Sequence, residues 1–410
     1  MYRGTGWAGS SKPSRRQRSL GQTKLPSCPG LPKVRFGLAV TSTQNDVAAF
    51  IILKPSGTKS QAQIFTAKLR AAPIGCRRRT RKTAPLKNIL VTGGSGFIGS
   101  HLTEALLAQG HRVLVVDDLS TGSADNLAHL RSNDQLEVVN RDIGNPQLVA
   151  ELVERSDVVY HLAAAVGVAL IAKQPIQTIE RNIYPTQLIL SELQRQILTG
   201  RKIPMFLAST SEVYGKNPKE VWSEGDDLVF GSTTKPRWSY GASKAIDEFL
   251  ALAYHREYQL PIVIGRFFNV VGPRQTGAYG MVLPRLIDSA LKNDPLIVHD
   301  DGQQVRCFAH VHDVVGAVLQ LMAEPTAAGR VFNIGSDNPV SILELAQHVC
   351  RLVNPEAKIE FQSYRQAYDD DFEDIRRRVP DLSRLRSTID YQPKHSLESI
   401  IRDVHQHLRP

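Results

Sequence analysis

The stretch Asn88-Ile89-Leu90-Val91-Thr92-Gly93-Gly94-Ser95-Gly96-Phe97-Ile98-Gly99 joins a short apolar run to spaced glycines, and a helical pattern follows from Ser100 to Gln109. This order predicts a strand, a glycine turn and a helix. Gly93 permits the tight turn, Gly96 lets the backbone approach a pyrophosphate, and Gly99 lets the helix pack closely on the strand. Because a helix N-terminus attracts phosphate, the stretch predicts a dinucleotide-binding unit.

A second predicted strand, Arg112 to Val116, supports this interpretation because it ends in an acid. Asp117 lies 18 residues after Gly99. A carboxylate at this place can accept hydrogen bonds from both ribose hydroxyls and repels a 2′-phosphate. The cofactor is therefore expected to be NAD and not NADP.

Strands and helices alternate through the rest of the chain, which predicts a parallel, doubly wound α/β sheet of the Rossmann type. On such sheets ligands bind at the carboxyl ends of the strands. The further strands are predicted at Leu136 to Asn140, Val158 to Leu162, Met205 to Ser209, Ile262 to Phe268 and Val331 to Ile334. The later helices are predicted at Met281 to Lys292, Asp313 to Met322, Ile342 to Val353 and Leu397 to Leu408.

Tyr240 and Lys244 lie four residues apart in a helical segment, on one face and about one turn from each other. A nearby ammonium lowers the pKa of a phenol, which turns a poor base into a usable one. Thr210, at the end of the Met205 strand, is expected to hold the substrate oxygen that Tyr240 deprotonates. Each of these residues is ordinary when taken alone.

Taken together, the motifs resemble the extended short-chain dehydrogenase/reductase family, in its NAD-dependent epimerase/dehydratase branch acting on nucleotide sugars. The resemblance covers about Lys87 to Arg409. Besides the glycine turn, it rests on His161-Leu162-Ala163-Ala164, Ser209 to Gly215, Tyr240 to Lys244, and Phe267-Phe268-Asn269-Val270-Val271-Gly272-Pro273-Arg274.

The resemblance implies roles for individual residues. In the family the tyrosine removes the proton of the sugar 4-hydroxyl while the C4 hydride passes to NAD⁺, giving a 4-keto sugar. Carried over, Tyr240 is the base, Lys244 its activator and Thr210 the hydrogen-bonding partner, with Ser211 and Glu212 as further catalytic residues. Cofactor contacts are expected from Gly93, Gly96, Phe97, Ile98, Gly99, Asp117, Asp142, Ile143, Ala163, Tyr240 and Lys244. Substrate contacts are expected from Asn269, Arg274, Arg306 and Arg378.

Three reactions are open to a 4-keto sugar in this family. Return of the hydride to the opposite face gives a 4-epimerase, an isomerase. Loss of a C5 carboxylate gives a decarboxylase and loss of water gives a 4,6-dehydratase, both lyases. Glu212 can move protons near C5, which simple epimerisation does not need. Thr210-Ser211-Glu212 with Arg378-Val379-Pro380-Asp381 resembles UDP-glucuronate decarboxylases, so decarboxylation is slightly favoured over UDP-glucose 4-epimerase chemistry, with dehydration third.

The N-terminal segment differs from the rest in charge. Met1 to Lys87 contains 18 Lys and Arg residues and one acid, Asp46, so its net charge is +17. Because the net charge of the whole chain is +10, the remaining residues together carry −7. We expect a disordered basic tail over residues 1–86, an NAD-binding domain over 87–270, and a smaller substrate-binding lobe over 271–410, of which about 300–335 returns to the core. The tail is consistent with a misassigned start, an organellar transit peptide or a nucleic-acid-binding arm.

Other properties complete the expectation. A cytoplasmic location is predicted, or an organelle stroma or matrix if the tail is a transit peptide. A UDP-sugar or another nucleotide sugar is the expected partner in a homodimer, without nucleic acid or membrane. His310 and His312 form an HxH pair, but no third ligand stands at a recognisable spacing, so no metal is expected. The alternative from another class is a non-catalytic NAD-binding redox sensor.

Overall fold

The computed structural model describes residues 36–43, 46–53, 85–165, 174–277, 281–367 and 374–409. The chain divides into two compact units, Met1–Lys82 and Thr83–Pro410, which are treated separately. Among the residues that the structure describes, no helix combines the length and apolarity needed to cross a membrane.

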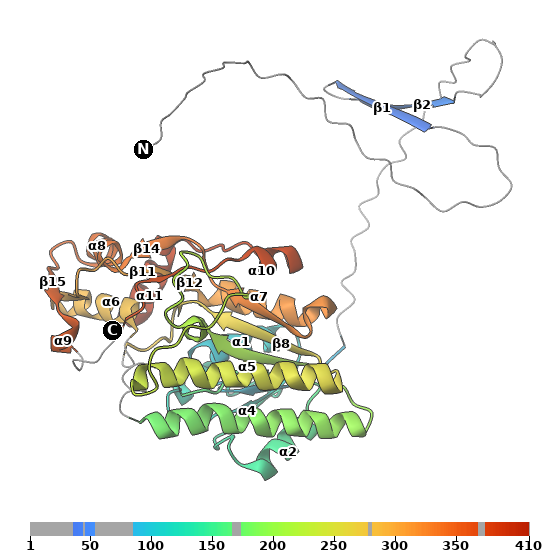
Figure 1. Cartoon of the computed structure of the whole chain (residues 1–410), viewed down its shortest axis with the longest axis horizontal. Coiled ribbons are helices and arrows are strands. Elements are labelled where there is room, and N and C mark those ends of the chain that lie inside the picture. Colours follow the sequence, from blue (N-terminus) through green and yellow to red (C-terminus); the bar gives the residue numbers. More distant parts are fainter. Residues whose placement is uncertain are drawn as a thin grey trace, which may run out of the picture. The chain divides into compact units, whose positions relative to one another are not determined.

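In the first unit, two strands pair antiparallel (Figure 1): β1 (Phe36–Thr43) and β2 (Asp46–Leu53), with Phe36 opposite Leu53. Both strands contain valine and phenylalanine, and β2 adds isoleucine, residue types that favour strands. These two strands were not predicted, and the disorder expected over residues 1–86 stays a prediction. The remaining residues before Pro85, including the basic run Arg77 to Lys82, lie outside the described part of the chain.

The second unit is built on a parallel seven-stranded sheet with strand order β13-β8-β7-β6-β3-β4-β5 (Figure 1). All seven strands were predicted, and their bounds agree within about a residue. They are β3 (Asn88–Thr92), β4 (Arg112–Val116), β5 (Leu136–Val139), β6 (Val158–His161), β7 (Met205–Thr210), β8 (Ile262–Phe267) and β13 (Arg330–Ile334).

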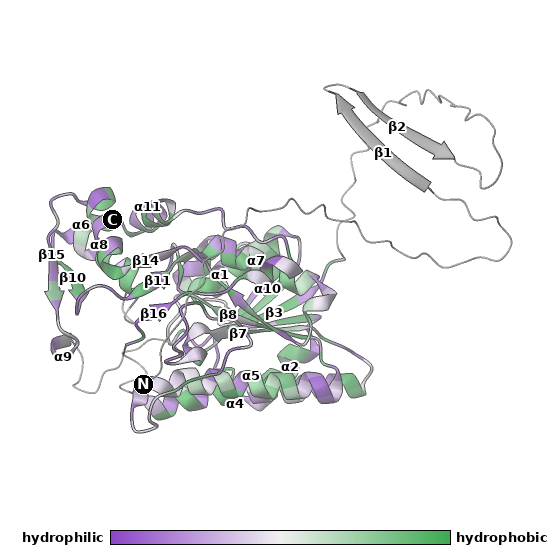
Figure 2. Ribbon diagram, turned by 45° about the horizontal axis from the view of Figure 1, so that its top comes forward, coloured by the Kyte–Doolittle hydropathy of each residue, from purple (hydrophilic) through white to green (hydrophobic). Residues whose placement is uncertain are grey.

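Helices cover both faces of this sheet, which confirms the doubly wound Rossmann-type fold. Successive residues of β3 illustrate the alternation: Ile89 and Val91 pack toward one core, and Leu90 packs toward the other. The strands are therefore apolar along nearly their whole length, as Figure 2 shows for β3, β7 and β8. One face carries α1 (Phe97–Ala108), α7 (Val311–Ala323) and α10 (Ser383–Thr388); the other carries α2 (Pro146–Glu154), α4 (Pro175–Leu198) and α5 (Ser239–Tyr258).

The C-terminal lobe has its own core, to which three amphipathic helices contribute: α6 (Val282–Lys292), α8 (Ile342–Val353) and α11 (Leu397–Leu408). Beside them, β10 (Leu296–His299) pairs with β15 (Ile359–Gln362). Three short strands, β11 (Val305–Cys307), β14 (Pro339–Ser341) and β16 (Arg377–Arg378), form a second small sheet. The remaining short elements are β9 (Val270–Val271), β12 (Ala309–His310), α9 (Tyr364–Ala367), η1 (Ala124–Leu130), η2 (Ser211–Tyr214), η3 (Pro236–Trp238) and η4 (Pro325–Ala327).

This lobe is interwoven with the sheet. After α7 the chain returns to form β13 at the edge of the sheet beside β8, then leaves again for β14 and α8. Because the seven strands are parallel, the residues that follow β3, β4, β6, β7 and β8 all lie at the carboxyl end of the sheet. The site lies at this end.

Candidate active site

The backbone of the glycine turn between β3 and α1 is closely packed. Gly93 has φ +70°, a backbone conformation that suits glycine. A Cβ added to Gly99 would lie 2.0 Å from the Gly93 carbonyl oxygen, so the helix can approach the turn only with glycine there. The N-cap of α1 is Gly96, and no side chain caps the helix. The first-turn N–H groups thus remain available to an anion in the adjoining cavity.

Asp117 comes directly after β4, and its side chain is hydrogen-bonded to the glycine turn. Its carboxylate accepts hydrogen bonds from the backbone N–H groups of Ser95 and Leu119, both at 2.9 Å. Burial raises its pKa from the ordinary value, although these hydrogen bonds oppose the shift. The carboxylate therefore has a structural role that the sequence did not indicate, beside its predicted role toward a ribose.

A cavity of about 1120 Å³ opens at this edge of the sheet. Its lining contains every predicted cofactor contact, namely Gly93, Gly96, Phe97, Ile98, Gly99, Asp117, Asp142, Ile143, Ala163, Tyr240 and Lys244. It also contains Thr210, Ser211, Glu212, Asn269 and Arg378. An uncapped helix N-terminus and a tyrosine–lysine pair in one cavity fit the two ends of a dinucleotide.

Tyr240 and Lys244 stand in the first two turns of α5, and Thr210 ends β7. Tyr240 forms a side-chain hydrogen bond with Thr210, whose predicted contact with the substrate oxygen stays a prediction. The Lys244 ammonium, however, donates to the carboxylate of Asp247 at 2.7 Å, and both side chains are buried. Burial and the charge of Glu212 raise the pKa of Tyr240 well above its usual range, so this geometry does not show the lowered pKa expected from Lys244.

Glu212, in η2, is held by two arginines that come from distant segments. Its carboxylate forms ion pairs of 2.6 Å with Arg237 and with Arg378, and Arg378 also reaches the Ser211 hydroxyl at 3.4 Å. Burial opposes ionisation of Glu212, but Arg378 and Arg237 outweigh it and lower the pKa to about 2. Glu212 is therefore ionised near neutral pH. Arg237 lines the cavity and was not predicted; its place three residues before Tyr240 is the signal that could have found it.

Two predicted substrate residues are placed elsewhere. Arg274 pairs with Glu104 of α1 at 2.7 Å and donates to the Ser100 hydroxyl at 3.2 Å, and it is not part of the cavity lining. Arg306 is buried and pairs with Asp374 at 3.0 Å, next to Arg378 in the β11–β16 register. It is also absent from the lining. In each case the guanidinium is paired with an acid, Glu104 or Asp374, in this structure.

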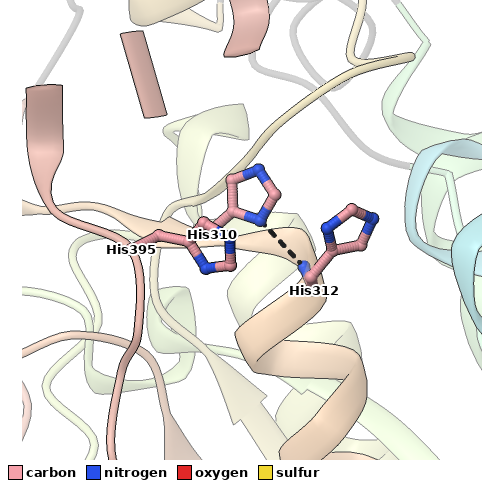
Figure 3. A group of neighbouring side chains, drawn as sticks. All are labelled: His310, His312 and His395. Atoms are coloured by element: carbon pink, nitrogen blue, oxygen red, sulfur yellow. Dashed lines mark hydrogen bonds between the residues drawn. The ribbon is translucent and has the colours of Figure 1, made fainter. Parts of the chain in front are cut away.

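A cluster of three histidines lies outside the cavity (Figure 3). His395 joins His310 and His312, so that one ring nitrogen from each lies within 4.8 Å of the others. His395 is the third histidine of the group, and the sequence did not place it beside the HxH pair. Two features nevertheless oppose a shared ion. The His310 and His395 rings are stacked with centroids 4.0 Å apart and planes 22° from parallel, which is not the arrangement of two rings that direct in-plane lone pairs at one ion. In addition, His310 Nδ1 already accepts the backbone N–H of His312 as the cap of α7. The absence of a metal stays a prediction.

Fold and site together define a class. A parallel Rossmann-type sheet with a glycine turn, and a threonine, a tyrosine and a lysine gathered in one cavity, make this an enzyme of the short-chain dehydrogenase/reductase type. The chain belongs to the family described as GDP-mannose 4,6 dehydratase, whose model matches residues 90–404. This confirms the resemblance to the nucleotide-sugar branch of the extended dehydrogenases.

Individual relatives narrow the comparison. The chain is 40% identical over 324 residues to a UDP-N-acetyl-alpha-D-glucosaminuronate decarboxylase of Bacillus cytotoxicus, covering 79% of this chain and 98% of the relative. It is 33% identical to UDP-glucuronic acid decarboxylase 1 of Arabidopsis thaliana, covering 79% of this chain and 69% of that protein. A crystal structure of UDP-glucuronic acid 4-epimerase from Bacillus cereus, in complex with UDP-glucuronic acid and NAD, superposes with a TM-score of 0.69 at 29% identity, covering 78% of this chain and 98% of the epimerase.

Proposed function

We propose that this chain is an NAD-dependent decarboxylase of a UDP-linked uronic acid, which oxidises the sugar at C4 to a 4-keto intermediate before carbon dioxide leaves. One observation carries the choice of reaction: Ser211, Glu212, Arg237 and Arg378 meet in the cavity that also holds Tyr240. The relatives named above as decarboxylases support the same choice.

The chain's own residues have distinct tasks in this reaction. Tyr240 takes the proton of the 4-hydroxyl, and Thr210 orients the same oxygen through its hydroxyl. When bound, NAD⁺ supplies the acceptor for the C4 hydride and a positive charge near the phenol. The resulting 4-keto group lies β to the C6 carboxylate. The C5–C6 bond can then break, with its electron pair moving into an enolate at C4 and C5 while carbon dioxide departs. A proton from solvent at C5, and return of the hydride to C4 with the Tyr240 proton to the 4-oxygen, complete the cycle.

The guanidinium of Arg378 is suited to the substrate carboxylate, because a planar fork binds two carboxylate oxygens at once. It stands beside the Ser211 hydroxyl, which can donate to the same group. Glu212 balances part of the positive charge, and because its pKa is so low it carries no proton to donate at neutral pH. Loss of water requires an acid beside the departing hydroxyl, and Ser211 stands where such an acid would precede Glu212, which supports decarboxylation over 4,6-dehydration.

The second candidate is a UDP-sugar 4-epimerase. The Bacillus cereus epimerase, solved with UDP-glucuronic acid, has the same fold and supports this alternative. The two reactions share the oxidation at C4, in which Tyr240 takes the 4-hydroxyl proton. The decarboxylase then loses the C5 carboxylate, whereas the epimerase keeps the substituent at C5 and receives the hydride back on the opposite face of C4.

One experiment tests the proposal. Purified protein is incubated with NAD⁺ and, separately, with UDP-glucuronate, UDP-N-acetylglucosaminuronate, UDP-glucose, UDP-N-acetylglucosamine and GDP-mannose, and products are identified by mass and NMR. The expected result is a product of one uronic acid that has lost the mass of carbon dioxide. A product of unchanged mass and inverted C4 would establish the epimerase, and a loss of water the dehydratase. Tight NAD binding without turnover of any sugar would favour a redox sensor.

We also propose a homodimer formed through α4 and α5, which pack side by side on one face of the sheet (Figure 1). Large apolar side chains remain exposed on both helices: Ile176 at 70% and Phe249 at 65%, with the exposed Ile179 and Ile246 each three residues away. Such a patch is typical of a protein interface. The cytoplasmic location and the boundary between lobes near residue 270 stay predictions.

A further inference from the structure

The lysine expected to activate the tyrosine has a partner of its own. Lys244 and Asp247 are three residues apart on α5, and Lys244 Nζ lies 2.7 Å from Asp247 Oδ2. The exposed fractions of the two side chains are 3% and 0%. Water screens such a pair poorly, so each charge acts strongly on the other. Asp247 does not line the cavity, and its contact with the site is made through Lys244.

The other acidic groups near Lys244 form ion pairs with arginines, and not with Lys244. On α5 itself, Glu248 pairs with Arg266 of β8 at 2.7 Å and accepts from the Ser209 hydroxyl. From η2, Glu212 pairs with Arg237 and Arg378. From β6, His161 is neutral near pH 7, because burial and the charge of Lys244 lower its pKa to about 3. From α4, Thr186 offers a hydrogen bond to the Asp247 carboxylate. Lys244 is thus the cation with which the Asp247 carboxylate forms its ion pair.

We propose that Asp247 is a positioning residue that anchors the Lys244 ammonium and offsets its charge, and so sets how strongly Lys244 promotes ionisation of Tyr240. The inference rests on the proposed function, in which Tyr240 is the base. The Lys244–Asp247 ion pair has two opposing effects on the ionisation of Tyr240. The ion pair fixes the ammonium one turn from the phenol, and the carboxylate also removes part of the field that would stabilise a phenolate. The phenol therefore stays protonated until further positive charge enters the cavity with the cofactor, which links formation of the base to cofactor binding.

The test measures ionisation of Tyr240 directly, in the protein saturated with NAD⁺ and without sugar. Tyrosinate absorbance is monitored against pH in the wild type and in Asp247→Asn, each as a difference from its Tyr240→Phe counterpart. Without the carboxylate, the expected titration midpoint falls by about one pH unit, a tenfold gain in phenolate at a given pH. The low-pH limb of the kcat profile should move in the same direction.

Two further variants make the result specific. Asp247→Ala removes the charge without leaving a buried amide and should shift the midpoint downward as well, which covers poor folding of the asparagine variant. Glu192→Gln is the matched control, since Glu192 forms an i,i+3 pair with Arg195 on α4 outside the cavity, and it should leave the midpoint unchanged.

The possible outcomes distinguish the proposed role of Asp247 from the proposed function of the enzyme. A folded Asp247 variant whose Tyr240 midpoint and pH profile stay at the wild-type position, or move upward, overturns the role of Asp247. A uniform loss of kcat at every pH, with an unshifted midpoint, would show a purely structural role and also overturn it. A shifted midpoint in a protein that converts no nucleotide sugar would uphold the Asp247 effect and defeat the proposed function.

Discussion

Replacing Arg237 with methionine tests the double ion pair around Glu212. The pKa of Glu212 falls from 4.5 to about 2, and this depression corresponds to about 3 kcal/mol of stability above pH 4.5. Removing one of two partners is expected to cost roughly half of that or more, with about 3–5 kcal/mol as the upper bound for breaking a buried pair. We therefore expect a loss of about 2–4 kcal/mol at pH 7.5.

The assay is thermal unfolding of the full chain. A folded unit the size of Thr83–Pro410 has an unfolding entropy of roughly 0.7 kcal/mol per kelvin, so Tm should fall by about 3–6 °C. Because the folded pKa of Glu212 lies below its unfolded value, the stability it contributes is present above pH 4.5 and is lost as the pH falls toward 2. The Tm difference should therefore be constant between about pH 8 and 6 and shrink below pH 4.5.

Controls make this prediction falsifiable. Arg376→Met removes an exposed ion pair with Asp301 and should change stability by less than about 1 kcal/mol. The double variant Arg237→Met with Glu212→Gln should lose less than the sum of the two single variants, because the unpaired charge is gone. Equal Tm values for the wild type and Arg237→Met at pH 7.5, or a difference that persists unchanged at pH 3, would refute the reasoning.

The site and the helix pair support three further predictions. Tyr240→Phe should lower kcat by about 10²–10⁴-fold with an unchanged Kd for NAD⁺, measured by calorimetry, and full activity would exclude the phenol as base. Asp117→Asn removes the charge that repels a 2′-phosphate, so the ratio of NADP⁺ to NAD⁺ affinity should rise about tenfold or more, and an unchanged ratio would contradict that role. Phe249→Glu should convert a dimer to a monomer in light scattering, and a wild type that is already monomeric would rule out the proposed interface.

The fold could be predicted from the sequence because its signals are local. Strand β3, the glycine turn and α1 are contiguous, and the apolar runs of the other strands are short and bounded. Parallel strands then place Asp117, Thr210 and Asn269 at one edge of the sheet. The structure places every expected cofactor contact in the cavity, together with Asn269 and Arg378.

The partners of charged side chains could not be predicted in this way. Arg378 reaches Glu212 from a distant part of the chain, and Arg274 turns to Glu104 across 170 positions, so both directions depend on how the lobe packs on the sheet. Asp247 lay close to Lys244 in the sequence, but its importance depends on burial, which one helical turn does not reveal. The pairing of β1 with β2 was missed because the basic composition of the tail outweighed two short strand-forming segments.

The late return of the chain to the sheet affects synthesis. Strand β8 is complete at Phe267, but its neighbour β13 is not made until Ile334 has left the ribosome. During that interval β8 has an open edge of unpaired backbone groups, which invites pairing with other nascent chains. A premature stop between these two strands would therefore yield an aggregating fragment and not a smaller working enzyme.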